Sequence, residues 1–162
     1  MAYGSANFSG EEWLDTVTLA PDLVISQQSI GVANSSSGFD GLGIDGILGL
    51  GPVDLTNGTV NNTETVPTVM DNLRSQGKIP EETLGVYYIP ISESSTGELT
   101  LGGYDNSVIT SSVNYVSLTT TSPASRYWGI DQSITYGSDI ILSSTAGIVD
   151  TGTTLILIAT GE

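Results

Sequence analysis

One short stretch of the sequence has the residue types that acid–base chemistry needs. Residues 146–155 read AGIVDTGTTL, so two β-branched apolar residues precede Asp150 and Thr151, Gly152 and Thr153 follow it. This pattern predicts a buried strand that delivers one carboxylate to a tight turn, where glycine admits close backbone approach and the threonines supply hydroxyl donors. Proteins tune the pKa of a carboxylate held in this way for acid–base work. The alternative is an aspartate that only stabilises its own turn.

The composition excludes most other catalytic chemistries. The 162 residues contain no cysteine and no histidine. Disulfides, thiolate metal sites and the usual base of serine and cysteine hydrolases are therefore excluded, and so is the commonest zinc ligand. We expect no metal and no cofactor, and any acid–base chemistry must use carboxylates.

The charge balance is strongly acidic, with 18 acidic residues against three basic ones and a net charge of -15. Nucleic acids and anionic membrane surfaces are therefore not expected partners, because both require a cationic patch. Charged residues make up only 13% of the chain, and glycine, serine, threonine and β-branched residues are abundant. This composition is typical of an all-β globular protein rather than of a disordered acidic tail. The excess of carboxylates favours a protein that works at acid pH, where protonation relieves their repulsion.

Four N-glycosylation sequons favour a secreted protein. They begin at Asn7, Asn34, Asn57 and Asn61. Single sequons arise by chance in a chain this rich in serine, threonine and asparagine, but together they indicate a secretory origin. The N-terminus has no signal-peptide pattern and no run is long and apolar enough to span a membrane. We therefore expect a secreted protein whose signal peptide is not in this sequence.

Most of the chain has the alternating pattern and turn residues of short β-strands. The expected strands cover residues 13–19, 23–33, 84–91, 98–104, 113–120, 127–136 and 140–143. The glycine-rich apolar run 44–51 indicates a further buried strand that other backbone crosses closely.

A single helix is expected at residues 67–76. Apolar residues recur there at helical spacing, namely Val66, Val69, Met70 and Leu73. Pro67 suits a first helical turn and Gly77 suits a C-terminal cap. Met70, on the apolar face, is expected in the core.

Four motifs occur in order along the chain. They are Tyr3-Gly4-Ser5 with Gly10, the run DGILGLG at 45–51, LGGYD at 101–105 followed by YWGI at 127–130, and the stretch 147–155. In this order they resemble the pepsin-like aspartic proteases, particularly the cysteine-free secreted enzymes of fungi. By this resemblance they are the flap hairpin, a strand of the first lobe, the crossing into the second lobe and the second catalytic aspartate loop.

The resemblance covers nearly the whole chain and implies a mainly β structure, part of the bilobal acid-protease fold. Residues 1–104 would be the remainder of the first lobe from the flap onward. Residues 105–162 would be the start of the second lobe, including its Asp-Thr-Gly loop.

The resemblance also implies a role for each residue of the aspartate loop. In this family two aspartates share a proton, because like-charged carboxylates this close cannot both ionise. One acts as general base on a water, and the protonated one polarises the scissile carbonyl. Asp150 would be one of the two. Thr151 would brace the two aspartate loops, Gly152 would give a backbone contact to substrate, and Thr153 would hydrogen-bond the carboxylate.

The same resemblance assigns two regions outside that loop. Tyr3, Gly4 and Ser5 would form the flap, whose tyrosine closes over substrate and excludes water. Leu42 and Ile44 would line an apolar substrate pocket.

The sequence departs from the family pattern in two main respects. No other Asp-Thr-Gly or Asp-Ser-Gly occurs in it, and Asp131 and Asp139 lie in different contexts. The apolar strand that supports the second aspartate in the family is also missing, and Ala6 replaces a usual flap glycine. We therefore expect an internal piece of a secreted aspartic endopeptidase, inactive alone and acting on peptide or protein substrates only if complemented.

Two other interpretations stay open. The chain could be a non-catalytic secreted binding protein, such as an immunomodulator or an allergen. Alternatively, a homodimer could restore a dyad from two copies of Asp150, because a two-fold axis brings identical residues face to face. Strands that lack neighbours would also favour self-association through unpaired sheet edges.

Overall fold

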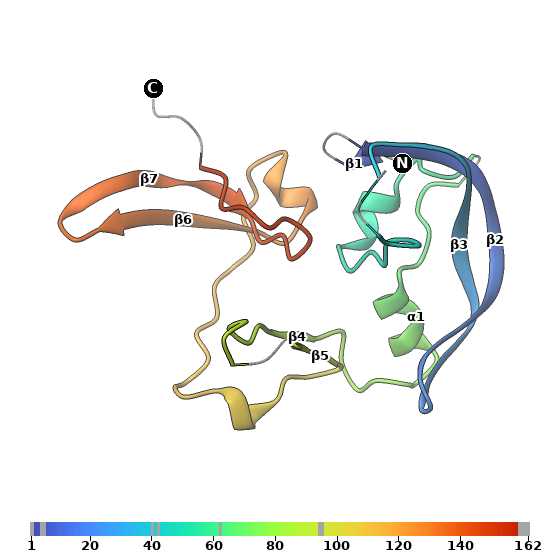
Figure 1. Ribbon diagram of the computed structural model, residues 1–162, viewed down its shortest axis with the longest axis horizontal. Helices are drawn as coiled ribbons and strands as arrows, with labels where there is room; N and C mark the ends of the chain where they lie inside the picture. Colours follow the sequence, from blue (N-terminus) through green and yellow to red (C-terminus); the bar gives the residue numbers. More distant parts are fainter. Residues whose placement is uncertain are drawn as a thin grey trace. The chain divides into compact units, whose positions relative to one another are not determined.

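The computed structural model describes residues 2–3, 6–39, 41, 43–61, 63–93 and 96–158. It contains two compact units, Met1–Ser112 and Val113–Glu162 (Figure 1). Strands predominate and one short α-helix is present among the described residues, as the sequence predicts. In the same part of the chain, no helix has the length and apolar character needed to cross a membrane.

A long antiparallel ribbon forms much of the first unit. Strand β1 (Ala2–Tyr3) pairs with β2 (Ala6–Ala20), which pairs along its length with β3 (Leu23–Ser37) (Figure 1). Both long strands extend beyond the predicted 13–19 and 23–33, because their polar ends pair with each other from Asn7 opposite Ser37. Backbone pairing does not require apolar side chains, so the alternation of apolar and polar residues underestimates the length of such strands.

Helix α1 (Val69–Ser75) has well-formed caps at both ends. Thr68 is the N-cap, and it forms a capping box in which the Asp71 N–H donates to Thr68 Oγ1 at 3.3 Å and the Thr68 N–H donates to Asp71 Oδ2 at 2.7 Å. The helix therefore begins two residues after the predicted Pro67, since Thr68 is in the extended conformation. Gly77 ends it as predicted, with φ +67° and a 3.0 Å bond from its N–H to the Arg74 carbonyl.

The apolar core of the first unit lies between α1 and β3. Its buried residues are Ile25, Val69, Met70, Leu73 and Ile79. Partly buried leucines from several segments pack against them: Leu19, Leu23, Leu50 and Leu101. The predicted core position of Met70 is confirmed.

Amide side chains also join α1 to β3. The Asn72 amide donates to Gln28 Oε1 at 3.0 Å, and Gln76 both accepts from the Ser26 N–H at 3.0 Å and donates to the Ser26 carbonyl at 2.9 Å. Gln27, between the two anchored residues of β3, adopts the left-handed φ of 57°. The helix is therefore held to the strand by directional bonds as well as by apolar packing.

The later part of the first unit contains the 3₁₀ turns η1 (Val53–Thr56) and η2 (Asn106–Val108) and the hairpin of β4 (Leu84–Tyr87) and β5 (Glu98–Leu101). Both strands are shorter than the predicted 84–91 and 98–104. Pro90 cannot donate to a sheet, and its carbonyl instead accepts from the Glu93 N–H in a turn. Gly102, at φ +87°, turns the chain directly after β5.

The strand expected at 44–51 is not formed, so that prediction is wrong. Ile44 and Ile47 are each 50% exposed, and these residues have no strand assignment. A strand requires a hydrogen-bonded neighbour, and no described segment pairs with this run. Leu50 alone from this run packs against the core.

The second unit consists of the 3₁₀ turn η3 (Ala124–Arg126) and the hairpin of β6 (Gly129–Tyr136) and β7 (Asp139–Ile148) (Figure 1). Strand β7 is longer than the predicted 140–143, because it pairs with β6 along its whole length. The strand predicted at 113–120 is wrong. Within the described residues it reduces to a single bridge from Leu118 to Ile130 on β6.

We predict that Leu73→Ala lowers the free energy of unfolding of the first unit by about 2–5 kcal/mol. Leu73 is fully buried at the centre of the core, and alanine keeps the helix propensity. Urea unfolding followed through the α1 amide NMR signals measures the change. Leu99→Ala on β5, where the side chain is exposed, is the matched control and should change stability by less than about 0.5 kcal/mol. Equal losses in both variants would contradict this account of the core.

Candidate active site

Asp150 lies on the turn that directly follows β7, and both of its carboxylate oxygens have a donor. The Gly152 N–H donates to Oδ1 at 2.9 Å, and the Thr153 hydroxyl donates to Oδ2 at 2.6 Å. The preceding Val149 N–H donates to the Trp128 carbonyl at 2.9 Å, which attaches the start of this turn to the residue before β6. The predicted contact of Thr153 with the carboxylate is therefore present.

These donors lower the pKa of Asp150. The Thr153 hydroxyl, and then the Gly152 N–H, hold the pKa of the Asp150 carboxyl below its ordinary value, while slight burial acts in the opposite direction. Hydrogen bonds donated to a carboxylate favour its charged form. The ionised form of the Asp150 carboxyl is therefore favoured in this structure.

The expectation of a buried strand leading to Asp150 is only half right. Strand β7 does run to Ile148, but Ile148 and Val149 are 43% and 55% exposed. The apolar run 155–158 is exposed too and has no strand assignment. The described sheet of this unit has only the strands β6 and β7. No further layer of the described unit covers the side chains beside Asp150.

A buried threonine outside the hairpin hydrogen-bonds to β6. Thr119 is 5% exposed, its hydroxyl donates to Asp131 Oδ1 at 2.8 Å, and its N–H donates to the Gly129 carbonyl at 2.9 Å. An added Cβ at Gly129 would lie 2.3 Å from the Ala124 carbonyl oxygen, so this close crossing requires glycine. The sequence gives no sign of the Thr119–Asp131 contact, because the partners are 12 residues apart and meet only across the strand pairing.

The remaining predicted residues of the aspartate loop and flap are placed as follows. Thr151 is exposed. Tyr3 ends β1 and pairs with Ala6 on β2, so a hairpin is formed where the flap is expected. Gly4 and Ser5 lie outside the described residues. The flap role stays a prediction.

The structure describes only one of the two residues predicted to line a substrate pocket. Leu42 lies outside the described residues, and Ile44 is half exposed in an irregular segment. Ile44 and Asp150 belong to different units. Their joint role in substrate binding also stays a prediction.

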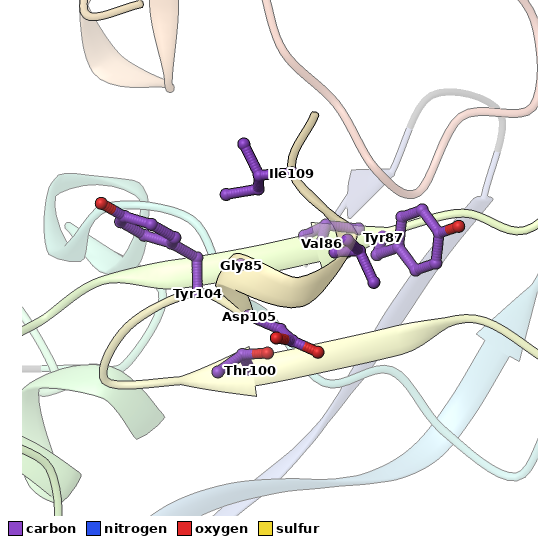
Figure 2. Close-up of a pocket in the computed structure, with 8 residues that line it drawn as sticks. Gly85, Val86, Tyr87, Thr100, Tyr104, Asp105 and Ile109 are labelled. Atoms are coloured by element: carbon purple, nitrogen blue, oxygen red, sulfur yellow. The ribbon is translucent and has the colours of Figure 1, made fainter. Parts of the chain in front are cut away.

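A hollow of about 160 Å³ lies on the β4–β5 hairpin and η2 (Figure 2). Its lining residues are Gly85, Val86, Tyr87, Thr100, Tyr104, Asp105, Val108 and Ile109. Ser107 donates from both its N–H and its hydroxyl to Asp105, at 2.7 Å and 2.8 Å, and these bonds lower the pKa of the Asp105 carboxyl. None of the predicted catalytic residues lines this hollow.

Metal-ligating side chains do not cluster in the part of the chain that the structure describes. No group of three or more histidine, cysteine, aspartate or glutamate side chains is close enough there to hold an ion.

Comparison with known proteins decides the family. The family model described as eukaryotic aspartyl protease matches residues 1–162. This chain belongs to the eukaryotic aspartyl proteases. The assignment to the pepsin-like aspartic proteases is thereby confirmed.

Fungal members of the family are similar to this chain. It is 61% identical to polyporopepsin of Irpex lacteus, with 98% of this chain and 47% of that protein covered. It is 36% identical to rhizopuspepsin-1 of Rhizopus niveus, with 98% and 39% covered. The crystal structure of the Irpex lacteus aspartic proteinase matches with a TM-score of 0.92 at 59% identity, over 99% of this chain and 48% of that one. The mainly β fold class is confirmed, and this chain spans less than half the length of these relatives.

We predict that Thr153→Ala raises the pKa of Asp150 toward the ordinary aspartate value, because it removes the larger of the two interactions that lower it. Titration of the Asp150 side-chain carboxyl by carbon NMR measures the shift. Thr153→Ser keeps a hydroxyl at this position and is the matched control, with the pKa expected to stay low. An unchanged pKa in Thr153→Ala would contradict the assignment of the donor.

The same interactions predict the direction of a pH effect on stability. The folded-state pKa of Asp150 is depressed, so the ionised carboxylate stabilises the fold at pH values above the unfolded pKa of about 3.9. This contribution is lost as the pH falls through the lower folded-state pKa. Thr153→Ala should therefore lose less stability than the wild type across this acid range, as urea unfolding at a series of pH values would show.

Proposed function

We propose that this chain carries one half of the catalytic dyad of an aspartic endopeptidase, with Asp150 as the aspartate of the family's second catalytic loop. The observation that carries the proposal is the Asp150 turn itself. Its carboxylate is held at both oxygens by the Gly152 N–H and the Thr153 hydroxyl, at the end of a strand. A family match over residues 1–162 supports it further.

The mechanism follows from placing a second carboxylate beside Asp150. Two carboxylates within hydrogen-bond distance cannot both ionise, so the pair keeps one proton, and pepsin-like enzymes are the standard example of this effect. The ionised member removes a proton from a water, whose oxygen bonds to the carbonyl carbon of the peptide. The protonated member polarises the carbonyl oxygen and then protonates the nitrogen as the C–N bond breaks. The donors on Asp150 favour the ionised role for it.

The other residues take the roles that the family pattern implies. Thr151 braces the two aspartate loops against each other, and Gly152 contributes a backbone contact to the peptide. Tyr3, with Gly4 and Ser5, closes over the substrate and excludes water. Leu42 and Ile44 line an apolar subsite. In this proposal, residues 1–104 belong to the first lobe and 105–162 to the second.

The chain by itself is proposed to be inactive. Its sequence contains one Asp-Thr-Gly loop, and it spans less than half of its fungal relatives. In this proposal, polypeptide outside residues 1–162 supplies the second carboxylate. We also propose that the protein is secreted and works at acid pH on peptide or protein substrates, in keeping with its four sequons and net charge of -15.

The chain alone should show no cleavage of an unfolded protein substrate at about pH 3–5, the carboxylate range, that a statine-type inhibitor blocks. A single carboxylate cannot supply both the base and the acid. The assay includes a measurement of mass in solution by analytical ultracentrifugation. Inhibitor-sensitive cleavage by a dimeric species would contradict this expectation and favour a dyad built from two copies of Asp150.

Complementation should restore activity. The chain is refolded with the segments of polyporopepsin that it does not match, which constitute about half of that protein. We expect inhibitor-sensitive cleavage that falls at least about 100-fold in Asp150→Asn, since general acid–base groups contribute about 10²–10⁴-fold. Asp139→Asn, at the exposed start of β7, is the matched control and should retain activity.

Association of the two parts is measured alongside the assay. An assembled complex that stays inactive, or one whose activity survives Asp150→Asn, would overturn the catalytic proposal. An assembled but inactive complex would favour the binding-protein interpretation instead.

A further inference from the structure

The segment from 52 to 66 forms a surface loop that closes on itself. At its base, the Val66 N–H donates to Thr56 Oγ1 at 2.7 Å, and the Thr56 hydroxyl lies 2.7 Å from the Val53 carbonyl and 3.1 Å from that of Val66. Above these contacts, the Gly58 N–H donates to the Glu64 carbonyl at 3.2 Å. The loop therefore holds its shape through its own polar contacts, as compact surface loops do.

A tight turn in this loop presents Asn57 to solvent. Residues 56–59 form a type II turn, with Asn57 at φ -59° and ψ 123° and Gly58 at φ +70°. The Thr59 N–H closes the turn by donating to the Thr56 carbonyl at 3.1 Å, and the Thr59 hydroxyl donates to the same carbonyl at 2.8 Å. Asn57 occupies the second position of the turn and is exposed.

We propose that Asn57 is an N-glycosylation site, occupied in the secreted protein. Asn57-Gly58-Thr59 is a sequon with threonine at its third position. The group transferred is an oligosaccharide from a lipid-linked oligosaccharyl diphosphate. The Asn57 amide nitrogen bonds to the anomeric carbon, the bond from that carbon to the diphosphate oxygen breaks, the lipid diphosphate leaves with the electron pair, and the amide loses one proton.

The folded structure accommodates a glycan at this position without rearrangement. Asn57 is outside the core cluster and on no strand, so a glycan there extends into solvent and displaces no packed side chain. The turn is also sustained by bonds from Thr59 and Gly58 rather than by the Asn57 amide. Modification of that amide therefore leaves the loop intact.

The two serine sequons lie in a different environment. Asn7 is on β2 opposite Ser37, and Asn34 is on β3 at the irregularity beside Gly10. Both triplets are inside the same stretch of paired strands, where Ser9 lies opposite Ser35. A glycan on Asn7 would also sit on the hairpin proposed as the flap. The structure therefore favours Asn57 over these two positions.

The proposal rests on the secreted location given under the proposed function, but not on catalysis. The test is expression of the chain behind a cleavable secretion signal in a eukaryotic host. The secreted protein is treated with a peptide N-glycosidase in heavy-oxygen water, which leaves isotope-labelled aspartate where a glycan was attached. Peptide mass spectrometry then locates the labelled aspartates, and the label separates them from spontaneous deamidation of Asn57-Gly58.

We expect most secreted molecules to carry a glycan on Asn57 and to lose one glycan's mass in Asn57→Gln. Thr59→Ala should lose the same mass, and Thr59→Ser should retain it, because serine preserves the sequon. Asn61→Gln tests the neighbouring sequon and should leave the Asn57 glycan in place.

An unmodified Asn57 in the secreted wild type overturns the proposal, whether the other sequons are empty or occupied. The readout is taken on wild-type protein, so a variant that fails to fold does not decide the result. The complementation experiment uses unglycosylated protein from bacteria. A failure to restore peptidase activity and an unmodified Asn57 are therefore separate outcomes.

Discussion

Backbone hydrogen bonding between neighbouring strands controls which parts of this chain become regular structure. Each N–H and C=O needs a partner or water, and a run of apolar residues becomes a strand only where another segment lies beside it. Strands β2 and β3 satisfy each other over most of their length, polar ends included. The runs 44–51 and 155–158 have no such neighbour among the described segments, and their large apolar side chains are mostly exposed.

The same pairing places the catalytic candidate. Gly129 on β6 lies opposite Ile148 on β7, and the Val149 N–H continues the contact to the Trp128 carbonyl. Asp150 is therefore held at the end of a hairpin, and local donors then fix its carboxylate and lower its pKa. These donors favour the ionised carboxylate, and peptide hydrolysis requires both a group that accepts a proton and one that donates it. Membership of the aspartyl protease family explains why such a turn exists. In the proposed function, the second carboxylate comes from polypeptide outside residues 1–162.

Exposed apolar side chains precede and follow Asp150 in the sequence of the second unit. Ile148, Val149 and the run 155–158 all retain substantial solvent exposure. Where exposed apolar side chains form a large contiguous patch, that patch is typical of interfaces. The relatives are more than twice as long as this chain, which fits a surface made to contact further polypeptide of the same fold. We also propose self-association through unpaired strands, because a sheet edge without a neighbour has unpaired backbone N–H and C=O groups.

The sequence by itself determined the features whose causes are local. The helix at 69–75 follows from apolar spacing, the Thr68–Asp71 capping box and Gly77, which all act within a few residues. The Asp150 turn is equally local, since its donors are two and three residues along the chain. Only the tertiary structure decided that 44–51 is no strand, that Ile148 is half exposed and that Thr119 supports β6 through Asp131. These outcomes depend on which distant segment lies beside each of these residues. The local residue pattern does not identify that segment.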